Sequence, residues 1–277
     1  MPQDGSEFRN IFLRLFASGE LVSPRGLKVL EIENFEYTLS PYVRFANFEA
    51  RKLNVDYIKK EFLWYLKGDR FDRSIEEHAR MWAGLVNTDG SINSNYGQYI
   101  FGTDNQFDDA LRVLVEDRDS RRASIMILNS VHLKSVTPDV PCTYSLNFRI
   151  RRGRLNMTVR MRSQDAIFGM CNDAPTFSFI HEMMLHSLRR HYLDLGYGEY
   201  HHSADSFHVY ERHFKMLDQI VGGAKASYRS PREPSPYADV PCPRMLDHTE
   251  VEFLRRGDFA SVPEQFFFTR WLLQEGE

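Results

Sequence analysis

Apolar residues recur at helical spacing in several parts of the chain. The first such segment, residues 6–18, carries a stripe of Phe, Ile and Leu side chains on one side. Similar spacing predicts further helices, at residues 56–67, 74–86, 104–117 and 175–193. Asp56 suits the N-cap of the second helix, which ends near Gly68, and Pro175 suits the first turn of the long apolar helix.

Alternating apolar and polar residues predict strands, most of them in the centre of the chain. They lie at residues 27–33, 35–46, 123–129, 142–151, 154–161 and 199–210. Arg152-Gly153 suits a hairpin turn between two of them. Residues 224–242 are rich in Ser, Pro, Gly and Arg and predict a long loop, and one or two helices follow within 250–275. This mixed order predicts a single domain of the α/β (α+β) class over residues 1–277.

Composition narrows the function classes. The chain has 277 residues, 42% of them hydrophobic, a formal net charge of -3 and a pI of about 6.4. A nucleic-acid partner is not expected at this charge, so any arginines that bind phosphate must lie in a local pocket. Cys142, Cys171 and Cys242 match no zinc or disulfide pattern, which favours a reducing, cytoplasmic setting. We expect no signal peptide and no membrane span.

Cys142 stands at the start of a predicted strand, directly after Pro141. A lone cysteine is usually a small buried hydrophobe. A nucleophilic cysteine needs positive charge nearby to lower its pKa. If strands 142–151 and 154–161 form a hairpin, Arg162 lies at the same open end as Cys142 and can supply that charge.

Arg162-Ser163 offers a guanidinium group and a hydroxyl, a pair that suits a phosphate. The alternative is an ion pair between Arg162 and Asp165 at the end of the strand. The adjacent Arg121 and Arg122 point to opposite faces of an extended segment. They are either solvated surface residues or ligands for the phosphate of a neighbouring subunit.

Two carboxylates stand in unusual positions. Glu61 shares a helix face with the apolar side chains of Ile58 and Phe62, where a carboxylate is costly unless it is paired or functional. It is therefore either a general acid or base or a residue that reaches the surface. Asn172 and Asp173 precede Pro175, and either of them suits the N-cap of the long helix. Capping does not exclude a ligand role.

Histidines are frequent between residues 201 and 213. His208 and Tyr210 lie two apart in a predicted strand, so they face the same side and can bind a sugar hydroxyl. Neighbouring strand histidines diverge, and no carboxylate is spaced to complete a metal site. We therefore expect no metal.

Together these motifs resemble the thymidylate synthase family, and within it the pyrimidine nucleotide hydroxymethylases. The resemblance covers residues from about 55 to 213. It rests on Glu61-Phe62-Leu63-Trp64-Tyr65-Leu66-Lys67-Gly68, Asn95-Tyr96-Gly97, Asp119-Ser120-Arg121-Arg122, Pro141-Cys142, Arg162-Ser163-Gln164-Asp165 with Gly169, and His208-Val209-Tyr210. It implies a mixed sheet that is flanked by helices and packs at a dimer interface.

The resemblance also implies a covalent mechanism. Cys142 would add to C6 of a pyrimidine nucleotide, and C5 would then attack the one-carbon unit of 5,10-methylenetetrahydrofolate. Glu61 resembles the carboxylate that orders water for proton transfers. Trp82 and Tyr96 correspond to residues at the folate side, and Asp165 lies near both folate and base in relatives.

The contacts to the nucleotide follow from the same comparison. Arg162 and Ser163 resemble the phosphate site, and His208 and Tyr210 resemble the contacts to the sugar 3′-hydroxyl. Arg25 is our candidate for a further phosphate arginine near the N-terminus.

Arg121 and Arg122 resemble the pair that the other subunit lends to this site. The resemblance therefore implies an obligate homodimer. No matching segment is evident near the C-terminus, where relatives close the folate site.

Two departures from thymidylate synthases change the expected reaction. Asp173 stands where those enzymes have an asparagine that reads uracil, and a carboxyl group suits the 4-amino group and N3 of cytosine. Leu85 stands three residues after Trp82, where they usually have a second tryptophan. Its absence opens room for water to add to the exocyclic methylene intermediate in place of hydride.

The expected activity is therefore 5-hydroxymethylation of CMP or dCMP with methylenetetrahydrofolate and water, with CMP slightly favoured. The product would serve modified phage DNA or a nucleoside antibiotic. One alternative is thymidylate synthase activity on dUMP, and the other is a nucleotide-binding homologue without catalysis.

Overall fold

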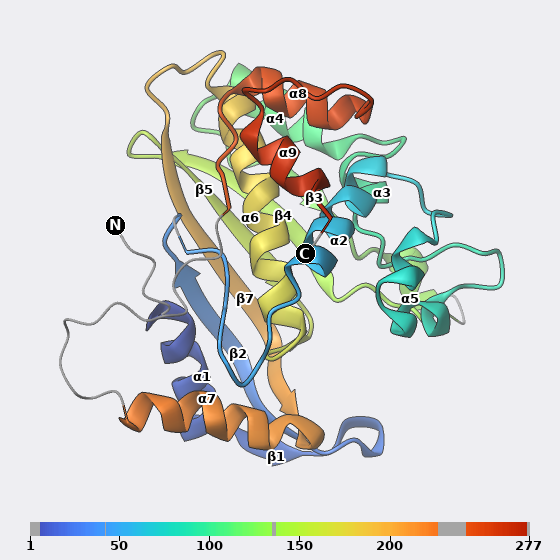
Figure 1. Ribbon diagram of the computed structural model, residues 1–277, viewed down its shortest axis with the longest axis vertical. Coiled ribbons are helices and arrows are strands. Elements are labelled where there is room, and N and C mark those ends of the chain that lie inside the picture. Colours follow the sequence, from blue (N-terminus) through green and yellow to red (C-terminus); the bar gives the residue numbers. More distant parts are fainter. Residues whose placement is uncertain (1–5, 42, 135–136, 227–241, 276–277) are drawn as a thin grey trace.

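A mixed β-sheet forms the centre of the molecule (Figure 1). The computed structural model describes residues 6–41, 43–134, 137–226 and 242–275. Within this part the sheet has seven strands in the order β1-β2-β7-β5-β4-β3, with β6 also paired to β7. They are β1 (Glu20–Val22), β2 (Val29–Leu39), β3 (Ser124–Met126), β4 (Thr143–Arg151), β5 (Arg154–Met161), β6 (Gln164–Asp165) and β7 (Gly196–Tyr210). β5 and β6 run parallel to β7 and the other pairs are antiparallel, which confirms the predicted mixed class.

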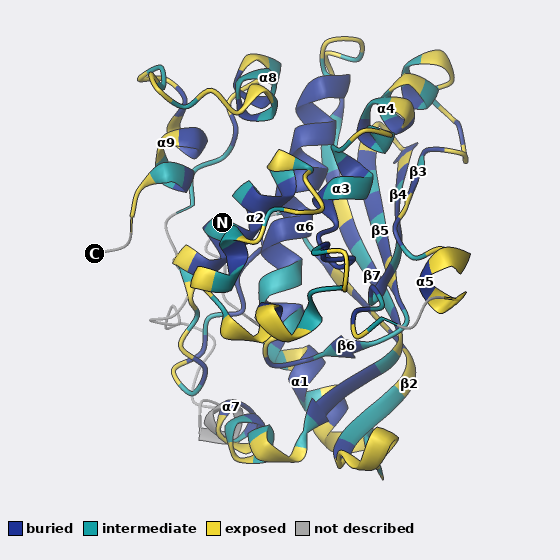
Figure 2. Ribbon diagram, turned by 90° about the vertical axis from the view of Figure 1, so that its right-hand side faces the viewer, coloured by how far each residue is buried: buried dark blue, intermediate teal, exposed yellow. Residues whose placement is uncertain are grey.

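Helices cover one face of this sheet and both of its ends. The α-helices are α1 (Ser6–Ser18), α2 (Val55–Lys67), α3 (Gly97–Ile100), α4 (Gln106–Glu116), α5 (Ser130–Lys134), α6 (Gly169–Leu188), α7 (Phe214–Ala226), α8 (His248–Arg256) and α9 (Phe267–Leu273). The 3-10 helices are η1 (Pro24–Gly26), η2 (Ser74–Glu77), η3 (Arg80–Leu85) and η4 (Glu211–His213). Helix α6 runs along the sheet and is buried over most of its length, as its apolar sequence requires (Figure 2).

Several predicted boundaries are wrong. The N-cap of α2 is Asn54, because its side-chain oxygen accepts a hydrogen bond from the amide of Tyr57 at 2.9 Å; Asp56 lies inside the helix. The predicted end at Gly68 is confirmed, with a left-handed φ of 62°. The helix predicted over 74–86 is instead η2 and η3, because the extended backbone of Ala79 interrupts it.

Helix α6 begins at Gly169, ahead of the predicted start at residue 175. Asp165 explains the early start, since its carboxylate accepts hydrogen bonds from the amides of Ile167 and Phe168 and orders the approach to the helix. Pro175 therefore lies inside α6. Asn172 and Asp173 are helical too and do not cap it, which corrects the capping interpretation.

The strands predicted over 27–33 and 35–46 are one strand, β2, which ends at Leu39. Asn34 lies within it at a φ of 52° and turns the strand without ending it. The predicted hairpin turn is confirmed, with positive φ at both Arg152 and Gly153. Most of the predicted loop 224–242 lies outside the described residues, and its first three residues belong to α7. The two helices expected in the tail are α8 and α9.

Helices α2 and α3 approach closely at Gly97. A Cβ atom there would lie 2.0 Å from the carbonyl oxygen of Tyr65, so no larger residue fits without moving the backbone. This contact joins the segment that carries Tyr96 to the helix that carries Glu61.

Gly97→Ala is expected to lower the free energy of unfolding by about 3 kcal/mol or more, because the added methyl group overlaps backbone. Urea denaturation measures the effect. Gly222→Ala in α7 is the matched control: a Cβ there meets nothing within 4 Å, so it should stabilise the protein by about 0.5 kcal/mol. Equal stability of the two variants would contradict the packing argument.

Candidate active site

Cys142 lies immediately before β4, at the open end of the β4–β5 hairpin. Its carbonyl oxygen accepts a hydrogen bond from the amide of Arg162 at 2.8 Å. The guanidinium of Arg162 also donates from Nε to the Pro141 carbonyl at 3.0 Å and from Nη2 to the Val140 carbonyl at 2.7 Å. The predicted register is therefore confirmed, and Arg162 fastens the segment that presents the thiol. The predicted ion pair between Arg162 and Asp165 does not appear among the ion pairs of the described residues.

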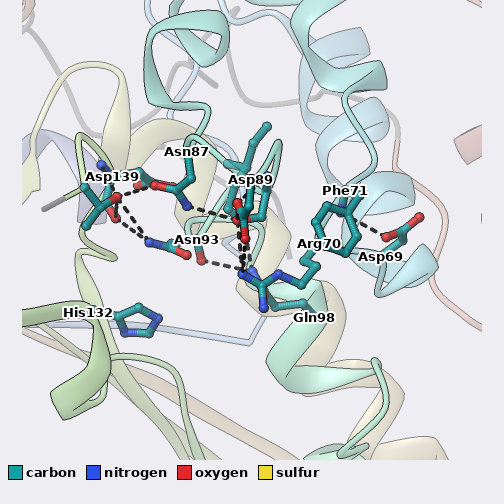
Figure 3. A network of polar contacts seen from close by, with 12 residues as sticks. Asp69, Arg70, Phe71, Asn87, Asp89, Asn93, Gln98, His132 and Asp139 are labelled. Carbon is teal, nitrogen blue, oxygen red and sulfur yellow. Dashed lines mark hydrogen bonds and ion pairs between the residues drawn. The ribbon is translucent and has the colours of Figure 1, made fainter. Parts of the chain in front are cut away.

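A buried polar network holds the chain just ahead of the thiol (Figure 3). The side chain of Asp139 accepts hydrogen bonds from the Ser94 amide, at 2.6 Å, and from the Ser94 hydroxyl. Asn93 donates to the Asp139 carbonyl at 2.8 Å. The residues before Tyr96 and those before Cys142 are thus tied together.

Burial raises the pKa of the Cys142 thiol above its ordinary value. Arg162 and Arg25 lower the pKa, whereas Asp173 and Asp139 raise it further. Arg162 therefore acts in the predicted direction, but desolvation of the thiolate outweighs it. Asp173 and Arg25 therefore lie close enough to the thiol to influence its pKa.

Glu61 projects from α2 into the interior, with 5% of its surface exposed. Its Oε1 accepts a hydrogen bond from the Tyr57 hydroxyl at 2.7 Å, and its Oε2 lies 3.3 Å from the Thr176 hydroxyl of α6. Burial raises the pKa of Glu61 to about 7, although both hydrogen bonds act in the opposite direction. A carboxyl group in this state can give or take a proton near neutral pH.

Asp173 lies on α6, one helical turn before Thr176. Its Oδ2 accepts a hydrogen bond from the Gln164 side chain at 3.1 Å, and Gln164 accepts one from the Tyr37 hydroxyl at 3.2 Å. Burial and then the charge of Glu61 raise the pKa of Asp173 to about 8. Two acids from different helices therefore lie near each other, and the charge of Glu61 disfavours the ionisation of Asp173.

Aromatic side chains line the same space. Trp82 is buried, packs edge-on against Trp64 with ring centroids 5.0 Å apart, and donates its indole N–H to the Tyr57 hydroxyl at 3.1 Å. The ring of Tyr96 stacks on Phe177 of α6. After burial, Cys142 and Asp173 raise the pKa of the Tyr96 hydroxyl most, so it too faces the thiol. Leu85 is half-buried at the end of η3.

His208 and Tyr210 share one face of β7, as predicted, with their rings 5.0 Å apart and perpendicular. His208 pairs with Asp165 of the neighbouring strand β6. Burial lowers the pKa of His208, and the charge of Asp165 opposes this shift. The imidazole is thus a neutral hydrogen-bonding group near neutral pH.

The arginines fall into two groups. Arg25 lies exposed in η1, and Arg162 and Ser163 are half-buried at the end of β5. Arg121 and Arg122 are exposed and lie towards the other end of β4. Their position follows from the next residue, Ala123, whose carbonyl accepts a hydrogen bond from the Phe148 amide. Six residues of strand, or about 20 Å, separate this point from Cys142. The structure therefore does not bring Arg121 and Arg122 to the thiol of their own chain.

The sequence pattern of thymidylate synthase matches residues 8–234. The chain belongs to the thymidylate synthase family.

Several similar members of the thymidylate synthase family come from phages. Deoxycytidylate 5-hydroxymethyltransferase of Enterobacteria phage T4 is 32% identical over 209 residues, which cover 72% of this chain and 82% of that protein. The phage T6 protein of the same name has the same identity and coverage. Deoxyuridylate hydroxymethyltransferase of Bacillus phage SP01 is 27% identical over 220 residues, which cover 73% of this chain and 56% of that protein.

In residues 6–41, 43–134, 137–226 and 242–275, no group of three or more His, Cys, Asp or Glu side chains is placed to hold a metal ion. Over the same ranges, no helix combines the length and apolar character needed to cross a bilayer.

Sequence reasoning missed several residues that support the site. Tyr57 lies four residues before Glu61 on the same helix, a spacing that would have revealed it. Gln164 stood within a quoted motif without a role. Arg51 is buried and donates to the Ile167 carbonyl and the Asn172 side chain, both at 2.9 Å; no local pattern pointed to it.

Glu61→Gln is expected to change how stability depends on pH. Folded Glu61 keeps its proton up to about pH 7, whereas the unfolded chain loses it near the ordinary value, so the acid's contribution to stability falls as pH rises between the two. The amide lacks this loss. Relative to wild type, the variant should therefore gain about 2 kcal/mol between pH 4.5 and pH 8 in urea denaturation. A difference that is the same at both pH values would contradict the raised pKa.

Proposed function

We propose that this protein transfers a hydroxymethyl group to C5 of a cytosine nucleotide, with methylenetetrahydrofolate as the one-carbon donor and water as the source of the hydroxyl group. The observation that carries the proposal is the Asp173 carboxyl group, which is half-buried on α6, retains its proton to about pH 8 and lies close enough to Cys142 to raise the pKa of the thiol. The names of the phage relatives agree with this class of reaction.

The protonation state of Asp173 matches cytosine. A neutral carboxyl group carries one donor and one acceptor, and these complement N3 and the 4-amino group of cytosine. As the Cys142 thiolate adds to C6, the ring gains electron density at N3, and Asp173 can donate its proton there. The Gln164 side chain keeps the acid oriented, because it donates to Oδ2.

The overall chemistry balances without an oxidant or a reductant. The bond from Cys142 sulfur to C6 forms first, and C5 then bonds to the one-carbon unit. The proton on C5 leaves, and the bond between the one-carbon unit and the folate nitrogen breaks, so that tetrahydrofolate departs with a proton on that nitrogen. Water then adds its hydroxyl group to the exocyclic carbon, and the bond between sulfur and C6 breaks. Glu61 is placed to move these protons, since its pKa of about 7 allows both directions.

The folate side is supported by the aromatic wall. Methylenetetrahydrofolate supplies the one-carbon unit, and its flat ring suits the surface formed by Trp82, Tyr96 and Leu85. The smaller Leu85 side chain leaves water a path to the reacting carbon.

The nucleotide's phosphate and sugar find partners around the thiol. Two N–H groups of Arg162 bind carbonyls, and its other donors, with Ser163 and Arg25, suit a phosphate. His208 and Tyr210 suit a sugar 3′-hydroxyl. The resemblance in sequence slightly favoured CMP, but the relatives at 32% identity are named for deoxycytidylate, so we place dCMP first and CMP second.

The exposed face of the sheet and the positions of Arg121 and Arg122 favour one catalytic domain that works as a homodimer. On the face of the sheet away from α6, which the described helices leave uncovered, Glu36, Ser203 and Arg160 form a row across β2, β7 and β5. A second copy packed on this face would cover it. Arg121 and Arg122, too distant for their own thiol, would then reach the phosphate of the partner.

The decisive measurement is the product mass after incubation with methylenetetrahydrofolate and each of dCMP, CMP, dUMP and UMP. We expect a hydroxymethylated cytosine nucleotide, and Cys142→Ala should lower its rate by about a thousandfold or more. A methylated uracil product would establish thymidylate synthase activity instead. Hydroxymethylated dUMP, the reaction for which the SP01 relative is named, is the second candidate. No product from any nucleotide would favour a binding protein.

Asp173→Asn is expected to shift preference from cytosine towards uracil nucleotides. The amide cannot protonate N3 of cytosine, but it offers N3–H and O4 of uracil an acceptor and a donor. The ratio of kcat/KM for dCMP to that for dUMP should fall by about 100-fold. An unchanged ratio would remove Asp173 from base selection.

Subunit mixing tests the lent arginines. A variant with Arg121→Ala and Arg122→Ala and a variant with Cys142→Ala should each be nearly inactive. Random re-pairing makes about half of the dimers mixed, each with one intact site, so the mixture should regain about a quarter of wild-type activity. The absence of any regain, with dimers confirmed by mass, would contradict the shared site.

A further inference from the structure

Three buried side chains form a chain of hydrogen bonds that ends at the candidate acid–base group. The indole N–H of Trp82 donates to the Tyr57 hydroxyl at 3.1 Å, and that hydroxyl donates to Oε1 of Glu61 at 2.7 Å. The three residues are 7%, 8% and 5% exposed, respectively, so water competes little for these bonds. They come from η3 and α2, and they connect the folate side with Glu61.

The direction of this chain is fixed by chemistry. An indole N–H can only donate, so the Tyr57 oxygen accepts from Trp82 and has its single proton left for Glu61. Oε1 of Glu61 is therefore an acceptor. When Glu61 is neutral, its proton must lie on the other oxygen, Oε2.

The surroundings of Oε2 agree with that assignment. It lies 3.3 Å from the Thr176 hydroxyl, which itself lies 3.0 Å from the Asn172 carbonyl. If Thr176 donates to Asn172, its oxygen is free to accept the proton on Oε2. All four groups are then satisfied, and the exchangeable proton of Glu61 faces α6, the helix that carries Asp173.

We propose that Tyr57 is a positioning residue that holds the Glu61 carboxyl in one orientation and directs its exchangeable proton to Oε2, on the side of the substrate. Trp82 supports this role by fixing the Tyr57 hydroxyl. The proposal rests on the proposed function only in that it gives Glu61 the proton transfers of the reaction.

Other titratable groups also face Glu61. Tyr65 lies on the same helix, and the charge of Glu61 raises its pKa; Asp173 faces Glu61 from α6. Burial disfavours the ionised carboxylate of Glu61, whereas the hydrogen bond from Tyr57 favours it. Removal of the Tyr57 hydroxyl should therefore raise the pKa of Glu61.

Tyr57→Phe tests this directly. The protein is labelled with ¹³C at the glutamate carboxyl carbons and titrated by NMR without substrates. The Glu61 signal is the one that is lost in Glu61→Gln. In wild type its titration midpoint should lie near pH 7. In the variant it should move up by about one unit, which is a tenfold smaller ionised fraction at a given pH below the midpoint. Trp82→Phe keeps a ring but loses the donor, and it should shift the titration in the same direction by less.

Tyr192→Phe is the matched control. It also removes a tyrosine hydroxyl, which donates to the Leu114 carbonyl at 3.0 Å and not to Glu61. The titration of Glu61 in this variant should therefore equal that in wild type. A Tyr57→Phe midpoint within about 0.3 units of wild type would overturn the proposal. If Tyr57→Phe does not fold, Trp82→Phe decides, and an unshifted midpoint there would overturn it as well.

Kinetics separate this proposal from the proposed function. If the reaction is as proposed, the kcat limb that belongs to Glu61 should move with the titration, while KM for the nucleotide changes less than about threefold. A shifted titration in a protein that makes no product would leave the positioning role standing and overturn the proposed reaction. A kcat limb that stays in place despite a shifted titration would overturn the catalytic part of the role.

Discussion

The removal of two neighbouring carboxyl groups from water is the constraint on which the rest of this structure depends. Glu61 from α2 is buried, Asp173 from α6 is half-buried within the charge of Glu61, and each is costly to hold in the ionised form. Both acids stay protonated at pH values where an ordinary carboxyl group is ionised, and hydrogen bonds satisfy their oxygen atoms. Tyr57 and Thr176 bind Glu61, and Gln164 binds Asp173. These hydrogen bonds lower both pKa values, but burial outweighs them, so the acids keep their protons up to about pH 7 and about pH 8.

The fold supplies the rigidity that such a site requires. Helix α6 is held against the sheet by nearly continuous burial, so Asp173 and Thr176 have fixed positions relative to β7. Helix α2 is held to the Tyr96 segment by the contact at Gly97, which permits no side chain. The thiol segment is fastened through Arg162 and Asp139. Each reacting group is thus carried on an element whose own position is fixed by packing or by several hydrogen bonds.

Sequence reasoning was most successful where local rules decide the outcome. The β4–β5 hairpin has a two-residue turn with positive φ, so its register, and with it the proximity of Cys142 and Arg162, could be deduced. The end of α2 followed from Gly68. The start of α6 could not be deduced in this way. Pro175 was a reasonable local signal, but Asp165 organises the earlier turn, and the resulting burial extends the helix past the proline.

The interaction between the two acids was beyond sequence reasoning, because Glu61 and Asp173 are far apart in the chain and meet only when α2 packs near α6. Their separate oddities were visible, as a carboxylate on an apolar face and an acid in place of an amide. What the pattern could not show is that the charge of Glu61 raises the pKa of Asp173. The hydrogen bond from Gln164 to Asp173 could not be deduced from the sequence either. The bond from Tyr57 to Glu61 could have been, because the two residues lie four apart on one helix.

The protonation of Asp173 also bears on selectivity. An ionised aspartate would accept from the cytosine amino group but would have no proton for N3, and it would repel O4 of uracil through like partial charge. In the proposed reaction a neutral aspartic acid would do more, because it would give its proton to N3 as Cys142 adds to C6. Uracil carries a hydrogen on N3, so a neutral acid that is fixed by Gln164 would leave a donor facing a donor. An unpaired buried group of this kind costs about 1–3 kcal/mol, which corresponds to roughly 10- to 100-fold in rate. On this argument, the environment that keeps Asp173 neutral contributes to base choice as directly as the residue itself.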